Sequence, residues 1–175
     1  QSQQLIFINK IITIKQNGNQ PMYEYRARIN RVVDGDTVDV DIELGFGIVL
    51  SDERVRIMGI DTPESRTSDK VEKLFGKAAK AHLQSLLGDV AILKTQIAKD
   101  GEDMKGKFGR VLGDFLLEDG RLVTQAMEEA GHCVPYMGGS KEDTQAGHMR
   151  NRTRLLGEGV VNQEDYDKAW EKMNG

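Results

Sequence analysis

Residues 34–44 have the sequence DGDTVDVDIEL, and this stretch decides which kind of fold the chain can adopt. The Asp34-Gly35 pair that opens it favours a tight turn. Apolar side chains then occupy the even positions from Val38 to Leu44, and acidic side chains occupy the odd positions between them. Because successive side chains of a strand point to opposite faces, the alternation predicts a half-buried strand with a solvated acidic face.

The sequence on either side predicts a mixed fold. Period-two or continuous apolar runs predict strands at 23–33, 48–50, 54–60, 90–97 and 111–117. Residues 51–53, Ser-Asp-Glu, predict a turn between the strands at 48–50 and 54–60. Apolar spacings of three and four predict a helix at 69–87, and further helices are expected at 122–130 and 164–173. A polar helix is expected at 140–156, because Ser140 and Asp143 have the spacing of a capping box. This order of elements favours the α+β class: a five-stranded OB-type β-barrel with about three helices packed on it.

The length of 175 residues fits one ordinary domain. The turn signals at 17–21 divide it into an N-terminal arm or extension (1–21), a main domain (22–156) and a C-terminal helical tail (157–175). The single cysteine, Cys133, excludes an intrachain disulfide, and we expect a small buried side chain there and a monomeric protein. No apolar run approaches the roughly 18 residues of a membrane helix. Without a signal-peptide pattern, both a cytoplasmic and a processed secreted protein fit.

The first segment with potential chemistry is the turn at 34–38. Asp36 shares the even parity of Val38 and Val40, so its carboxylate is expected to point towards the apolar face. A carboxylate in that position must be paired or bind a cation, because burying a bare charge is unfavourable. The simpler alternative is a turn aspartate that caps a backbone N–H group.

The second segment, RIMGIDTPE at 56–64, places an arginine and two acids at the end of a strand. Arg56 and Asp61 can meet on one side only if the strand bends, and Gly59 is the natural place for a bulge. The alternative is a surface cluster of charges that contributes little to stability.

The third segment, KGKFGR at 105–110, combines two glycines, three basic residues and Phe108. Such a loop suits contact with phosphate groups and stacking on bases, although a plain charged loop has the same composition.

The three segments complement one another chemically. Carboxylates with a backbone oxygen suit a hard cation of the Ca²⁺ or Mg²⁺ type, and two arginines can bind a phosphate group. A further glutamate can act as a base towards water. Together these groups indicate metal-assisted hydrolysis of a phosphodiester.

The motifs DGDTV (34–38), RIMGIDTPE (56–64), KFGR (107–110) and LEDGRLV (117–123) resemble those of the staphylococcal nuclease (thermonuclease) family in order and rough spacing. The resemblance runs from Arg28 to Tyr136, and the stretch after Gly138 follows the family less closely. It implies the OB-type barrel and a Ca²⁺-dependent nuclease that cleaves DNA and RNA with little sequence specificity. The implied products are 3′-phosphorylated, with a 5′-hydroxyl leaving group.

The resemblance also implies roles for individual residues. Asp36 and Asp61 resemble carboxylate ligands of Ca²⁺, and Thr62 resembles a ligand through its backbone carbonyl. Glu64 resembles the general base for the attacking water. Arg56 and Arg110 resemble the arginines that bind the phosphate and stabilise the transition state.

Three further positions resemble substrate contacts. Lys107 matches a phosphate-contacting position. Phe108 stands where the staphylococcal enzyme has a tyrosine, so stacking is retained and the hydroxyl is lost. Tyr136 matches part of the aromatic pocket of the family.

Two other functions stay open at this stage: an OB-fold module that binds single-stranded nucleic acid without cutting it, and a Ca²⁺-stabilised interaction domain. The net charge of −4 does not exclude nucleic acid, because nine of the 28 acidic residues lie in 34–64, the segment of the expected metal site. It predicts weak background binding and reliance on the cation and on local basic patches. The histidines His82, His132 and His148 have no metal-ligand spacing, and Tyr166 and Trp170 are expected to anchor the last helix.

Overall fold

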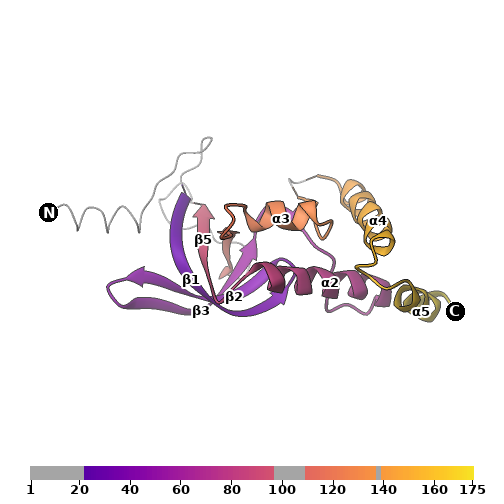
Figure 1. Cartoon of the computed structure of the whole chain (residues 1–175), viewed down its shortest axis with the longest axis horizontal. Coiled ribbons are helices and arrows are strands. Elements are labelled where there is room, and N and C mark those ends of the chain that lie inside the picture. The colour runs from indigo at the N-terminus through magenta and orange to yellow at the C-terminus, as the bar shows by residue number, and fades with distance from the viewer. Residues whose placement is uncertain (1–21, 97–108, 137–138) are drawn as a thin grey trace. The chain divides into compact units, whose positions relative to one another are not determined.

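The structure is a computed structural model that describes residues 22–96, 109–136 and 139–175. Its main element is a closed barrel of five strands in the order β1-β2-β3-β6-β5 (Figure 1). The strands are β1 (Met22–Asp34), β2 (Thr37–Gly45), β3 (Ile48–Ile57), β5 (Val90–Gln96) and β6 (Val111–Leu116). The α+β class and the OB-type barrel are therefore confirmed.

The other elements are short strands and helices. Strands β4 (Ile60–Asp61) and β7 (Val134–Pro135) form a two-stranded antiparallel sheet. The described residues contain four helices, where about three were predicted: α2 (Lys70–Leu86), α3 (Val123–Glu129), α4 (Lys141–Gly157) and α5 (Gln163–Asn174). None of these helices has both the length and the apolar character needed to cross a membrane.

The described residues form two compact units. The barrel unit comprises 22–31, 37–58, 87–96 and 109–122. The helical unit comprises 32–36, 59–86, 123–136 and 139–175.

The core of the barrel unit follows directly from the alternation in β2. Val38, Val40 and Ile42 are buried, as the even parity predicts. They share the interior with residues from the neighbouring strands, among them Val55 and Phe115, which are fully buried. Burying these side chains is the main stabilising contribution in the barrel.

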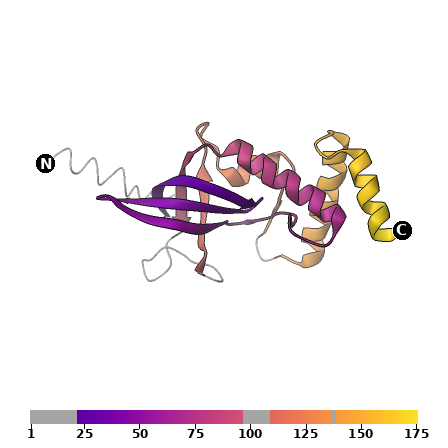
Figure 2. The same ribbon diagram turned by 90° about the horizontal axis from the view of Figure 1, so that it is seen from below.

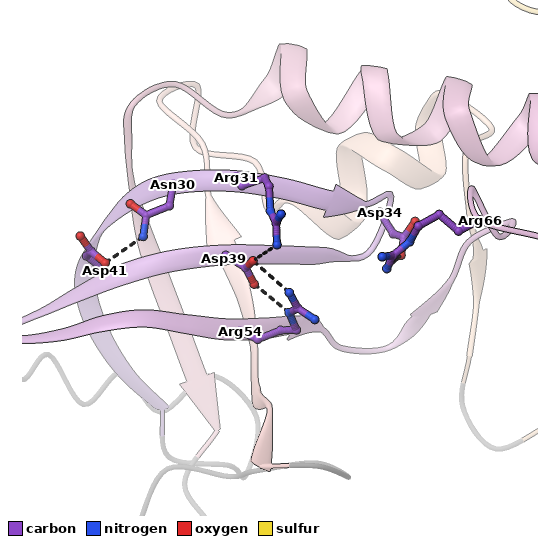
Figure 3. Close-up of polar contacts among 7 residues, drawn as sticks. All are labelled: Asn30, Arg31, Asp34, Asp39, Asp41, Arg54 and Arg66. Atoms are coloured by element: carbon purple, nitrogen blue, oxygen red, sulfur yellow. Dashed lines mark hydrogen bonds and ion pairs between the residues drawn. The ribbon is translucent and has the colours of Figure 1, made fainter.

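The predicted solvated face of β2 is wrong at Asp39, which is only 4% exposed. Arg54 on β3 donates from Nε and Nη2 to both Asp39 oxygens, at 2.8 and 3.0 Å, and Arg31 on β1 donates from Nη2 at 2.8 Å (Figure 3). The hydrogen bond from Arg54 is the main reason why the pKa of Asp39 lies below its ordinary value. The parity of the strand is correct, but long side chains from both neighbouring strands cover the acid.

The predicted turn at 51–53 is also wrong, because β3 continues through it. Asp52 adopts a left-handed backbone with φ of 53°, and its N–H group donates to Asp41 Oδ1 at 2.8 Å. The register between β2 and β3 shifts between Val40 and Ile42. The turn-like residues therefore mark a β-bulge. The predicted strand 54–60 ends at Ile57, and Gly59, with φ of 76°, separates it from β4.

The helical unit has its own small core, to which α2, α4 and α5 contribute (Figure 2). Phe75 of α2 is buried there, and the ring of Tyr166 meets it edge-on with centroids 6.2 Å apart. Tyr166 thus anchors α5 as predicted, whereas Trp170 is 52% exposed. The cap predicted for the polar helix is confirmed, because Ser140 Oγ accepts a hydrogen bond from the Asp143 N–H group at 3.1 Å.

We expect Asp39→Asn to destabilise the protein by about 1–3 kcal/mol, because it removes a buried acceptor that binds two guanidinium groups. Urea unfolding measures this change. The matched control is Asp119→Asn, which removes an aspartate that also pairs with an arginine but is half exposed. An equal loss for both variants would contradict the importance of burial.

Candidate active site

The helical unit contains four of the predicted site residues. Asp36 lies in the turn between β1 and β2, and Asp61 lies in β4. Thr62 directly follows and is 5% exposed, whereas Glu64 is exposed. Two separate acidic turns, around 34–36 and 61–65, therefore belong to one compact unit.

Helix α2 brings the two acidic turns together through small residues. A Cβ atom at Gly76 would lie 2.3 Å from the Glu64 carbonyl oxygen, so the backbone of the second turn rests directly on the helix. A Cβ atom at Gly35 would lie 2.8 Å from Ala79 Cβ and 3.3 Å from Thr62 Cβ. Gly76 and Ala79 are three residues apart and share one helix face. Both turns therefore contact the same strip of α2.

A second link between the two turns is made by the side chain of Asp34, in the first turn, which contacts residues at the end of the second. The Ser65 hydroxyl donates a hydrogen bond to Asp34 Oδ1. Arg66, which Figure 3 shows beside Asp34, has its Nη2 atom 3.2 Å from Asp34 Oδ2. The sequence was interpreted only as a turn at Asp34, so this linking role was missed. These contacts occupy both oxygens of Asp34 and make it a structural member of the cluster.

The packing of the two acidic turns affects the pKa of Glu64. The pKa of Glu64 is raised above its ordinary value, first by burial and then by the negative charges of Asp36, Asp34, Glu72 and Asp61. Its backbone N–H group donates to Glu72 Oε1 at 3.3 Å. The turns thus create a strongly negative region, and perturbed carboxylates of this kind are typical of functional sites.

The donor atoms suit a hard divalent cation. Asp36, Asp61 and the Thr62 carbonyl offer only oxygen, which Ca²⁺ prefers. A cation would also relieve the repulsion that raises the Glu64 pKa. No group of three or more His, Cys, Asp or Glu side chains in the described ranges is arranged to hold a metal by itself. The expected set of two carboxylates and one carbonyl has fewer oxygens than Ca²⁺ takes, so water or substrate oxygens would complete it.

The two predicted arginines belong to the barrel unit. Strands β3 and β6 run parallel, with Val55 opposite Val111 and Arg56 opposite Leu112. Val55 and Val111 point into the barrel, where both are buried. Arg56 therefore lies on the outer face, and Arg110, two residues before Leu112, has the same parity. The pairing places Arg56 on the outer face of β3, and Arg110 directly precedes β6.

The remaining predicted residues are more peripheral. Tyr136 is 52% exposed, and its backbone N–H group donates to the Gly59 carbonyl at 2.9 Å. Lys107 and Phe108 lie outside the described residues, so their predicted substrate contacts remain predictions.

Sequence reasoning missed His148, whose Nε2 atom lies 2.7 Å from Asp61 Oδ2. The two residues are 87 positions apart, and neither flanking sequence contains a metal-ligand spacing. The other two histidines also form a pair, since the rings of His82 and His132 stack with centroids 4.7 Å apart.

A small cavity of about 10 Å³ lies in the helical unit. Its wall includes His132, His148 and Arg152. Among the described residues, His132 Nδ1, His148 Nδ1 and Arg152 Nε are buried without a hydrogen-bond partner. Burial, and secondarily His82, lower the pKa of His132 to about 4, so this ring is neutral at physiological pH.

The chain combines a closed OB-type barrel with helices, and two acidic turns pack on helix α2. These features together define a recognisable class of domain. The family described as "Staphylococcal nuclease homologue" matches residues 54–155, which is more than half of the chain, and the chain belongs to this family. The match continues past Tyr136, where the resemblance was expected to end, and it begins after the turn at 34–36.

Individual relatives agree with this assignment. The chain is 30% identical over 120 residues to "Endonuclease YhcR" of Bacillus subtilis, and 28% identical over 113 residues to an "Uncharacterized endonuclease" of Escherichia coli. Each alignment covers 65% of this chain. It is 34% identical over 91 residues, 52% of the chain, to "Thermonuclease" of Staphylococcus intermedius. The aligned parts span 9%, 62% and 48% of these three relatives, respectively.

We expect Gly76→Ala to destabilise the protein by about 1–3 kcal/mol, because the new methyl group meets the Glu64 backbone. Alanine is otherwise the better helix former by about 1 kcal/mol, so the sign itself is diagnostic. Gly157→Ala is the matched control, since that helical glycine has no atom within 4 Å of a Cβ position. Thermal unfolding measures both, and a gain in stability at position 76 would refute the close approach.

We expect the neutral, buried His132 to make the fold sensitive to acid. Its folded pKa of about 4 lies below the ordinary 6.5, so the unfolded chain binds more protons between these values. Stability should therefore be fully present above about pH 7 and fall by up to about 3 kcal/mol as the pH drops to 4. In His132→Gln this part of the loss should disappear. Parallel stability curves for the two proteins, measured by urea unfolding at several pH values, would contradict the assignment.

Proposed function

We propose that the chain is a Ca²⁺-dependent nuclease that hydrolyses phosphodiester bonds of DNA and RNA with little sequence specificity. The observation that carries the proposal is the cluster of carboxylates in the two acidic turns that pack on α2, where desolvation and then the neighbouring negative charges raise the pKa of Glu64. The names of the relatives, endonuclease and thermonuclease, support the same reaction class.

In this proposal Asp36, Asp61 and the Thr62 carbonyl hold the cation. When bound, Ca²⁺ supplies positive charge that stabilises the phosphate oxygens as negative charge develops on them. Two carboxylates and a carbonyl leave coordination positions for such oxygens.

Glu64 acts as the general base. Its carboxylate accepts a proton from the attacking water, whose oxygen forms the new bond to phosphorus. The bond from phosphorus to the 5′ oxygen breaks, and the leaving oxygen takes up a proton from solvent to become a 5′-hydroxyl. Glu64 then releases the proton that it accepted to solvent. The phosphate stays on the 3′ oxygen of the other product, so both atoms and charges balance.

Arg56 and Arg110 bind the phosphate as its negative charge increases. The parallel pairing of β3 with β6 brings the two chain segments that carry them together, which supports a joint role. Planar guanidinium groups form paired hydrogen bonds with phosphate oxygens. Lys107 contacts the phosphate backbone, and Phe108 and Tyr136 offer rings for stacking. The exposure of Tyr136 is compatible with this contact.

The carboxylate cluster also favours cutting over simple binding. A module that only binds single strands gains affinity from basic grooves and aromatic platforms, and a concentration of acids opposes binding of a polyanion. The acids on α2 are therefore better explained by a cation and a base.

We expect purified protein to degrade both DNA and RNA with Ca²⁺ and to lose this activity in EDTA. Arg56→Ala should lower kcat by about 10²–10³-fold, because the transition state loses a charged donor. Arg121→Ala is the matched control, since this partly exposed arginine pairs with Asp119 and has no role in the proposed reaction. Tight binding of single strands without cleavage would establish the binding module instead, and unchanged kcat in Arg56→Ala would refute the role of that arginine.

A further inference from the structure

We infer that His148 is a positioning residue: its Nε2–H group fixes the carboxylate of Asp61 in the orientation in which Asp61 binds the divalent cation. This inference rests on the proposed function of Asp61 and adds a residue from a distant part of the chain. Its basis is one short contact, together with the way in which the surrounding elements hold both partners in place.

The contact itself is well suited to orienting a ligand. His148 Nε2 and Asp61 Oδ2 are 2.7 Å apart. An ionised carboxylate can only accept hydrogen bonds, so Nε2 carries the proton. The contact uses Oδ2, and Asp61 can therefore bind a cation through Oδ1. Hydrogen bonds to ligating groups commonly set both the direction and the basicity of metal ligands.

The side chain of His148 is more buried than that of Asp61, as expected if the histidine holds the aspartate in place. The imidazole of His148 is 11% exposed, whereas the carboxylate of Asp61 is 39% exposed. The histidine is thus the fixed partner, packed within the unit, and the aspartate keeps access to solvent and to a dissolved ion.

The backbone around His148 is held against the strand that pairs with Asp61. In the β4–β7 sheet, Asp61 lies opposite Val134. A Cβ atom at Gly147 would lie 2.7 Å from Val134 Cγ1, so α4 packs closely on β7. One turn further along, Asn151 Nδ2 donates to the Cys133 carbonyl at 3.0 Å. Contacts on both sides of His148 therefore fix the helix relative to the aspartate.

The opposite side of the imidazole also limits its freedom. Nδ1 is buried in the wall of the cavity that His132 and Arg152 share, without a hydrogen-bond partner among the described residues. A ring flip would place a carbon atom against Asp61 and lose the hydrogen bond. In the observed orientation, the ring keeps its hydrogen bond from Nε2 to Asp61.

Two variants of similar size separate hydrogen bonding from packing. His148→Leu fills the site without a donor, and His148→Gln keeps an N–H donor. We expect calorimetric titration with Ca²⁺ alone, in the full chain and without nucleic acid, to show about 10- to 100-fold weaker binding for the Leu variant. The Gln variant should recover much of the affinity. His82→Leu is the control, because His82 stacks on His132 rather than contacting Asp61.

The outcomes distinguish this inference from the proposed function. If wild type binds Ca²⁺ and cuts, while His148→Leu binds Ca²⁺ equally well, the positioning role is wrong and the nuclease proposal stands. Tighter binding by the Leu variant would show that His148 competes with the cation, which also overturns the role. If wild type neither binds Ca²⁺ nor cuts, both proposals fail.

A measurement on wild type keeps the test valid if the Leu variant does not fold. Nitrogen chemical shifts of the His148 ring report which nitrogen carries the proton. We expect protonated Nε2 both before and after saturation with Ca²⁺. Loss of that state when Ca²⁺ binds would mean that the contact breaks in the loaded protein, and it would overturn the inference.

Discussion

The close approach between α2 and the backbone at Glu64 is the constraint on which the rest of the helical unit depends. Glycine inside a helix is less favourable than alanine by about 1 kcal/mol, so Gly76 is a local disadvantage. In return, the second acidic turn lies directly on the helix, and Gly35 lets the first turn contact Ala79 on the same face. Two negatively charged segments that would otherwise repel each other are thereby held on one rigid element.

The two units shift the pKa of a carboxylate in opposite directions. In the barrel unit, two arginines neutralise Asp39 and hold its pKa below the ordinary value, which is the pattern of a structural ion pair. In the helical unit, desolvation raises the pKa of Glu64, and the negative charges of the nearby carboxylates raise it further. Stability alone would favour the first arrangement throughout. The second arrangement keeps an unfavourable charge distribution, as functional sites commonly do.

Sequence alone predicted the barrel because the period-two pattern of β2 is a local property of the chain. It also predicted that the turns around Asp36 and Asp61 carry the chemistry, and the structure places both turns in one unit. The burial of Asp39 could not be predicted, since it depends on Arg31 and Arg54 from other strands. The bulge at Asp52 could not be predicted either, because its residues have the composition of a turn. The contact of His148 with Asp61 has no local signal, because it arises from the pairing of β4 with β7.

The long sequence separation between Asp61 and His148 has a consequence for the order in which the protein forms. During synthesis, the ribosome adds about 5–20 residues each second, and the N-terminal part of a chain emerges first. Both acidic turns and α2 therefore emerge seconds before β7 and α4 exist. Strands β1, β2 and β3 are successive neighbours in the barrel, but Asp61 acquires its partner only after 87 further residues have been added. Maturation of the cation site is accordingly tied to completion of the C-terminal helices, and the newly made acidic turns first exist without that support.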